Sequence, residues 1–167
     1  MEGIKKPAGA ERPAGDHFIE GWLAMNYSKG TNYALHTMLD LAARKPGVKI
    51  GVQELAARQN VSPTYLSKIL TKLAKAGLVD SYSGAQGGYC LRRNKDDISF
   101  LDIIQAIEGN TPLFKGCESN GPGCLVESVM RESERKMDDH LRATTIGQLA
   151  DKMAAHLAEH GAVSKED

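Results

Sequence analysis

The strongest constraint on the fold lies in residues 52–91, where two helical patterns are followed by a glycine-rich turn. The first pattern, residues 52–59, predicts a short helix because its apolar positions recur at helical spacing. The second begins at Ser62 and Pro63, a pair typical of a helix N-terminus, and ends at Gly77. The apolar residues on the face of this second helix that should pack against the core are Leu66, Ile69, Leu70 and Leu73.

A hairpin is expected directly after this helix. Leu78-Val79 and residues 89–91 are short apolar runs, and the glycine-rich segment 83–88 between them predicts a tight turn. Further helices are expected from Ser28 to Pro46, from Ile98 to Glu108 and beyond residue 124. The order helix, short helix, turn, helix, hairpin predicts a mainly α protein with a small β-wing, a winged helix-turn-helix.

The chain divides into five predicted parts. Residues 25–95 form the winged helix-turn-helix, residues 96–123 a linking helix and a cysteine-containing sensor loop, and residues 124–160 a long helix followed by a terminal helix. Residues 1–24 are expected to be a loose extension, from an upstream start or a cloning remnant, and residues 161–167 a frayed tail.

Charge is segregated along the 167 residues, although 21 basic and 21 acidic side chains cancel overall. Residues 25–95 carry 11 basic and 3 acidic side chains, a net charge of +8, whereas residues 96–167 carry 7 and 14, a net charge of −7. This asymmetry is typical of a part that binds nucleic acid joined to a part that does not.

Several functional classes are disfavoured. No run of about 18 apolar residues predicts a membrane span, and no basic patch followed by an apolar stretch predicts a secretory signal, so a cytoplasmic protein is expected. The sequence has no glycine-rich phosphate loop, no serine-histidine-acid order and no clustered carboxylates for acid-base chemistry. We therefore expect a protein that is not an enzyme.

The second helix of the predicted motif would read double-stranded DNA. In a helix-turn-helix, the N-terminal residues of this helix contact base edges, and neighbouring cations contact phosphates. The glycines of the wing would permit a close approach to the backbone. The predicted DNA-binding residues are Ser62, Thr64, Tyr65, Ser67, Lys68 and Lys72 on the helix, and Ser83, Gly84, Gln86 and Gly87 in the wing.

The long helix after Cys124 has a narrow apolar stripe at nearly coiled-coil spacing, surrounded by charged residues. A stripe of this width favours packing against one other helix, so a homodimer is expected. Its members are Leu125, Val126, Val129, Met130, Met137 and Leu141.

Cys117 and Cys124 are candidates for chemistry because a pliable glycine- and proline-rich loop separates them. Cys124 also opens the long helix, whose partial positive charge favours a thiolate. Cys90 lies on a predicted strand and is expected to be a small buried hydrophobic residue.

Several segments together resemble the Rrf2 family of bacterial winged-helix regulators. They are MNYSKG at 25–30, YALH at 33–36, Tyr65-Leu66, LAKAGLV at 73–79 and GGYCL at 87–91. The resemblance covers residues 25–158 and implies a homodimer that presents two wings to a palindromic operator. Ser83 stands where the family usually has an arginine, and Ser67 where many members have a glutamate, so the operator sequence is not transferable from a relative.

The family also implies a sensory site. Cluster-binding members hold iron–sulfur clusters with three cysteines in this loop and a ligand from the partner's first helix, whereas this chain has two, Cys117 and Cys124; a minority of the family instead uses two cysteines, a histidine and a carboxylate. By this resemblance Cys117, Cys124 and His36 would hold a two-iron two-sulfur cluster, with Asn32 or Glu127 as the fourth ligand. Two alternatives stay open: a cofactor-free thiol-disulfide switch that uses the same cysteines or one of them with Cys90, and an adaptor that binds protein.

Overall fold

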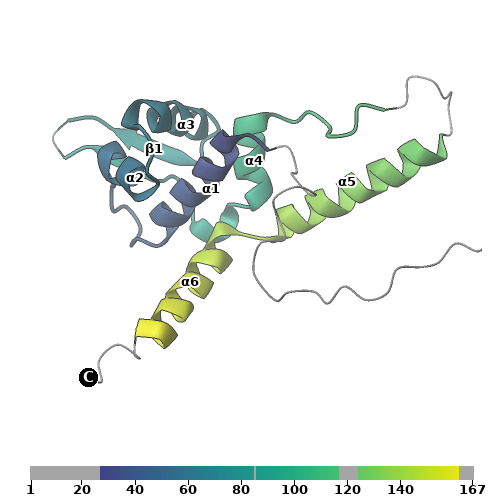
Figure 1. The fold of residues 1–167 in the computed structure, drawn as a ribbon. Coiled ribbons are helices and arrows are strands. Elements are labelled where there is room, and N and C mark those ends of the chain that lie inside the picture. Colours follow the sequence, from purple (N-terminus) through teal and green to yellow (C-terminus); the bar gives the residue numbers. More distant parts are fainter. Residues whose placement is uncertain (1–26, 85, 117–123, 162–167) are drawn as a thin grey trace, which may run out of the picture.

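The computed structural model describes residues 27–84, 86–116 and 124–161. It confirms the predicted fold class, a mainly helical chain with one two-stranded antiparallel sheet (Figure 1). The elements in chain order are α1 (Lys29–Ala42), α2 (Val52–Arg58), α3 (Pro63–Lys75), β1 (Val79–Tyr82), β2 (Gly88–Leu91), the 3-10 turn η1 (Lys95–Asp97), α4 (Phe100–Glu108), α5 (Leu125–Ala143) and α6 (Ile146–Gly161). The expectations for residues 1–24 and for the tail after Gly161 lie outside the described residues.

Side chains cap the starts of α1, α3 and α4, and the sequence predicts the start of α3 at Ser62 and Pro63. The Ser28 hydroxyl accepts from the backbone of Thr31 at the start of α1, and Ser62 caps α3 in the same way with proline in its first turn. Ser99 and Asp102 form a capping box on α4. Helix α4 starts at Phe100, two residues after the expected Ile98, because Ser99 is its N-cap, and the Ile98 carbonyl accepts from Ile146 N over 2.9 Å at the start of α6.

The wing is a hairpin in which Val79 pairs with Leu91 and Tyr82 with Gly88. Gly87 is required there, because a Cβ at this position would lie 2.3 Å from the Tyr82 carbonyl oxygen. The segment before α2 also pairs with the hairpin, because Ile50 exchanges two backbone hydrogen bonds of 2.9 Å with Tyr89 of β2.

The hydrophobic core continues beyond the predicted DNA-binding region. Met38 of α1, Leu66 and Leu70 of α3, and Ile103 of α4 belong to one buried cluster. Ile146 of α6 is buried in the same cluster. Helices α4 and the start of α6 are therefore part of the body that holds α3 in place.

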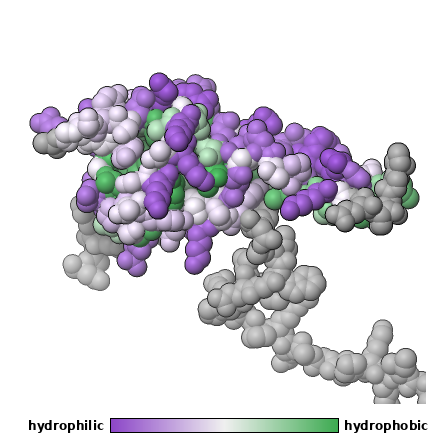
Figure 2. All heavy atoms as spheres, turned by 90° about the horizontal axis from the view of Figure 1, so that it is seen from above, coloured by the Kyte–Doolittle hydropathy of each residue, from purple (hydrophilic) through white to green (hydrophobic). Residues whose placement is uncertain are grey.

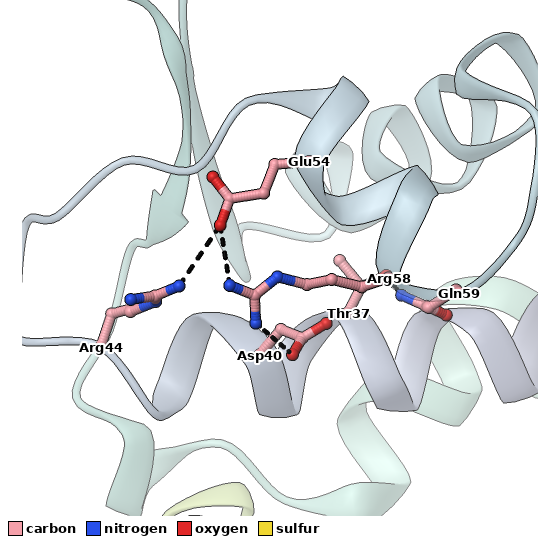
Figure 3. Close-up of polar contacts among 6 residues, drawn as sticks. All are labelled: Thr37, Asp40, Arg44, Glu54, Arg58 and Gln59. Carbon is pink, nitrogen blue, oxygen red and sulfur yellow. Dashed lines mark hydrogen bonds and ion pairs between the residues drawn. The ribbon is translucent and has the colours of Figure 1, made fainter.

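Polar contacts fix α2 on α1 (Figure 3). Arg58 pairs with Glu54 at 2.7 Å and with Asp40 at 3.3 Å, and Arg44 pairs with Glu54 at 3.3 Å. Gln59 Nε2 also donates to Thr37 Oγ1 over 2.8 Å. These contacts orient the first helix of the helix-turn-helix.

Helix α5 projects away from this body (Figure 1) and contains no buried residue. Helix α6 begins with a capping pair in which Thr145 Oγ1 accepts from Gln148 N and Gln148 Oε1 accepts from Thr145 N, each over 3.2 Å. Thr145 is therefore the residue that caps the start of α6. Within the described ranges, no helix has both the length and the apolar character needed to cross a bilayer.

Candidate nucleic-acid interface and cysteine loop

The first turns of α3 are open to solvent. Ser62, Thr64 and Lys68 are exposed, and Ser67 is half-buried. Tyr65 keeps 38% of its surface exposed while its ring packs edge-on against Tyr33, with the ring centroids 5.8 Å apart. These residues form the α3 reading surface, defined as Ser62, Thr64, Tyr65, Ser67 and Lys68.

Lys72, which sequence reasoning placed with Lys68 on the same basic face, has a protein partner. Its Nζ donates to the carbonyl oxygen of Ile107, the next-to-last residue of α4, over 3.0 Å. For Lys68 no ion pair is found within the part of the chain that the structure describes. The two lysines therefore have different surroundings although both are exposed.

The positive charge of residues 25–95 is partly neutralised by local pairs. The three acidic residues of this region each pair with arginine: Asp40 and Glu54 with Arg58, and Asp80 with Arg92 at 3.3 Å. The basic residues of the region without an ion pair in the described ranges are Lys29, Lys45, Lys49, Lys68, Lys72, Lys75 and Arg93.

The wing tip carries the remaining predicted DNA-binding residues. Ser83, Gly84 and Gln86 are exposed, and Gly84 has a φ of 96°, a conformation that favours glycine. Sequence reasoning missed Lys49, whose Nζ lies 4.1 Å from the centroid of the Tyr82 ring at the end of β1. This cation lies beside the wing because Ile50 pairs with β2, which no local pattern signals.

The apolar stripe of α5 is largely uncovered. Leu125, Val126, Val129 and Met130 are 82%, 60%, 65% and 42% exposed, while Met137 and Leu141 are half-buried. Figure 2 shows hydrophobic atoms at the outer end of the projecting helix beside hydrophilic side chains along it. A solvent-exposed stripe of this size is typical of an interaction surface.

The cysteine loop is described only at its two ends, and Cys117 lies between them, outside the described residues. Cys124 is half-buried and is the N-cap residue of α5. Gly116 lies close to the first turn of α5, since a Cβ placed on it would be 3.8 Å from Glu127 Oε1. Glu127 itself accepts from Arg131 over 2.7 Å, so it would have to leave this ion pair to bind a metal.

His36 and Asn32 are both exposed on α1. Nδ1 of His36 lies 2.9 Å from the Asn32 carbonyl oxygen, which can only accept, so Nδ1 donates and Nε2 of the neutral ring keeps its lone pair. Ligating histidines commonly have this arrangement. Among the described residues, no three His, Cys, Asp or Glu side chains converge as a metal site.

Cys90 is buried on β2, as predicted. Burial raises the pKa of its thiol, and the nearby carboxylate of Asp80 raises it further. A protonated, buried thiol is a poor nucleophile, so Cys90 is disfavoured as a redox partner for the loop cysteines.

Comparison with known proteins identifies the family. Residues 27–152 match the Rrf2 family, described as an iron-dependent transcriptional regulator. The chain belongs to the Rrf2 family. IscR of Vibrio cholerae is 31% identical over 153 residues, which span 84% of this chain and 88% of that protein. This Rrf2 chain is a transcriptional regulator and not an enzyme, as the sequence predicted.

Two solved structures of Rrf2 proteins share the fold. CymR, the global cysteine regulator of Bacillus subtilis, is 30% identical with a TM-score of 0.67, and the match covers 75% of this chain and 95% of that one. The oxidized form of Staphylococcus aureus CymR is 32% identical with a TM-score of 0.65, covering 75% and 96%.

Proposed function

We propose that this Rrf2 protein binds double-stranded DNA sequence-specifically, with residues 25–95 as the DNA-binding part. The observation that carries the proposal is the exposed α3 reading surface at the N-terminal end of a helix-turn-helix. Thr64 and Tyr65 have the hydroxyl groups that base edges can pair with, and Lys68 supplies a charge for phosphate. The proposal includes a cytoplasmic location, in which a regulator of this bacterial family would reach DNA.

We further propose that residues 124–160 form a homodimer. The exposed stripe on α5 would be covered by the same stripe of a second copy, because a two-fold axis brings one surface patch onto itself. Two reading surfaces related by a two-fold axis would recognise a palindromic operator.

The DNA-binding proposal is tested by selecting duplexes from a random pool with the wild-type protein and comparing two threonine variants on them. Thr64→Ala should lower the preference for the selected duplex over a random one by roughly 1–3 kcal/mol. Thr71→Ala is the matched control, because its hydroxyl already donates to the Ser67 carbonyl on the same helix. Equal effects of the two variants would contradict the proposal.

We also propose a redox-responsive site that joins the loop before α5 to the start of α5, in which Cys117 and Cys124 would be the thiolate ligands. His36 of the partner subunit would be the third ligand through Nε2, and Asn32 or Glu127 the fourth. The donor set suits an iron–sulfur cluster, which would supply one-electron redox chemistry when bound. The support is the position of Cys124 at the start of α5, the closeness of Gly116 to that turn, and the hydrogen bond on His36 Nδ1.

The second candidate is a thiol switch in which Cys117 and Cys124 form a disulfide. It is favoured by the likeness to the oxidized form of Staphylococcus aureus CymR. Protein purified without oxygen in the presence of iron should show visible absorption and stoichiometric iron and sulfide if the cluster is present. If it shows neither, peptide mass mapping after mild peroxide should find Cys117 bonded to Cys124. Both cysteines reduced under peroxide would contradict the switch.

A further inference from the structure

The last turn of α4 is bonded to the start of α1. Glu108 Oε1 accepts from the backbone N of Ser28 over 2.7 Å and also from Thr31 Oγ1. Thr31 is 1% exposed whereas Glu108 is exposed, so this contact lies at the edge of the buried core. A carboxylate at the N-terminus of a helix is favourable because the backbone N–H groups there are unpaired and carry partial positive charge.

The same turn is bonded to α3. Lys72 donates to the Ile107 carbonyl, one of the last carbonyls of α4, which have no partner within their own helix. Burial alone would raise the pKa of Glu108, but hydrogen bonds from Thr31 and Ser28, together with the charge of Lys72, hold it below its ordinary value.

Helices α1 and α3 also touch each other beside this turn. The rings of Tyr33 and Tyr65 meet edge-on. A Cβ on Gly30 would lie 3.5 Å from Ile107 Cγ2 and 3.7 Å from the Tyr65 hydroxyl oxygen, so this position of α1 lies close to both other helices. Three helices therefore meet at one point, which we call the α4 junction: Ser28, Thr31, Lys72, Ile107 and Glu108.

We infer that the α4 junction positions the DNA-reading helix, and that Lys72 is a positioning residue within it and not a phosphate contact. The inference rests on the proposed function of α3. Gly109, the first residue of the loop that carries Cys117, follows Glu108 directly. The candidate sensory loop is thus covalently attached to the point that fixes the recognition helix.

The test compares two neighbouring lysines. Lys68→Met and Lys72→Met each remove one charge at nearly constant length, and binding is measured against salt on a duplex selected by the wild type and on a random duplex. Lys68→Met should reduce the salt slope by about 0.9 per protomer, which is about 1.8 for a bound dimer, on both duplexes. Lys72→Met should leave the slope unchanged and lower the selected-to-random affinity ratio about fivefold. An equal loss of slope in both variants, with the ratio kept, would overturn the inference.

A second set of variants tests the junction at residues that lie outside the α3 reading surface. Thr31→Val removes the hydroxyl that donates to Glu108 at nearly constant volume, and it should lower the affinity ratio about fivefold, whereas Thr31→Ser should keep it. Glu108→Ala, at an exposed position, should act like Thr31→Val without disturbing the core. If Thr31→Val and Glu108→Ala keep the wild-type ratio, the junction does not position α3. A wild type that prefers no duplex would instead overturn the proposed function.

Discussion

Replacing Val129 by aspartate should separate the proposed dimer without unfolding the chain. Val129 is 65% exposed in the single chain, so its removal costs the core little. In a dimer, the lost apolar burial amounts to about 1 kcal/mol per protomer, and an unpaired carboxylate in the contact costs about 2 kcal/mol more. A two-fold axis doubles this to about 6 kcal/mol, which weakens the dimer about 10⁴-fold.

Sedimentation equilibrium measures this effect, and circular dichroism shows whether the helices persist. Ser128→Asp is the matched control, since Ser128 is exposed and, at 3.6 residues per turn, lies on the opposite side of α5 from the stripe. It adds the same charge one position away and should stay dimeric. A dimeric Val129→Asp, or a monomeric Ser128→Asp, would refute the reasoning about the stripe.

Three further outcomes are expected. The pKa of Glu108 in the folded protein is below its ordinary value of 4.5. The ionised Glu108 side chain therefore contributes fully to stability above pH 4.5, and this contribution is lost as the pH falls through the folded pKa. Glu108→Gln should lower the melting temperature more at pH 7 than at pH 3. Gly87→Ala should weaken DNA binding, because the added Cβ would clash with the Tyr82 carbonyl and distort the wing. Unchanged DNA affinity together with unchanged hydrogen exchange of the wing amides would contradict this prediction. His36→Ala should reduce the iron content of anaerobically prepared protein, whereas full iron loading would exclude His36 as a ligand.

The parts of the fold that were predictable depend on short-range chemistry. Ser62 and Pro63 act within one helical turn, so the sequence shows this helix start directly, and the Ser99–Asp102 capping box found in the structure is equally local. The hydrogen bond from Lys72 to Ile107 spans 35 positions. No periodic pattern connects residues that far apart, and the exposed face of α3 could therefore be predicted while the partner of Lys72 could not.

The distribution of charge along the sequence predicted the basic region but not its ion pairs. Counting residues predicted a basic region correctly, but a count does not show which cations are paired. Arg58 and Arg92 are held by Glu54 and Asp80, and these pairs depend on how α2 and the hairpin pack. Likewise, the closeness of Gly116 to Glu127 follows from the path of the chain after α4, which loop composition does not specify.

Hydroxyl-radical footprinting of the wild-type protein on its selected duplex tests the central claim most directly. A dimer with two reading surfaces should protect two half-sites whose centres lie about 10 base pairs, or a multiple of one helical turn, apart, with two chains bound per duplex. Protection of a single half-site by one chain, or uniform protection regardless of sequence, would contradict a dimeric, sequence-reading regulator.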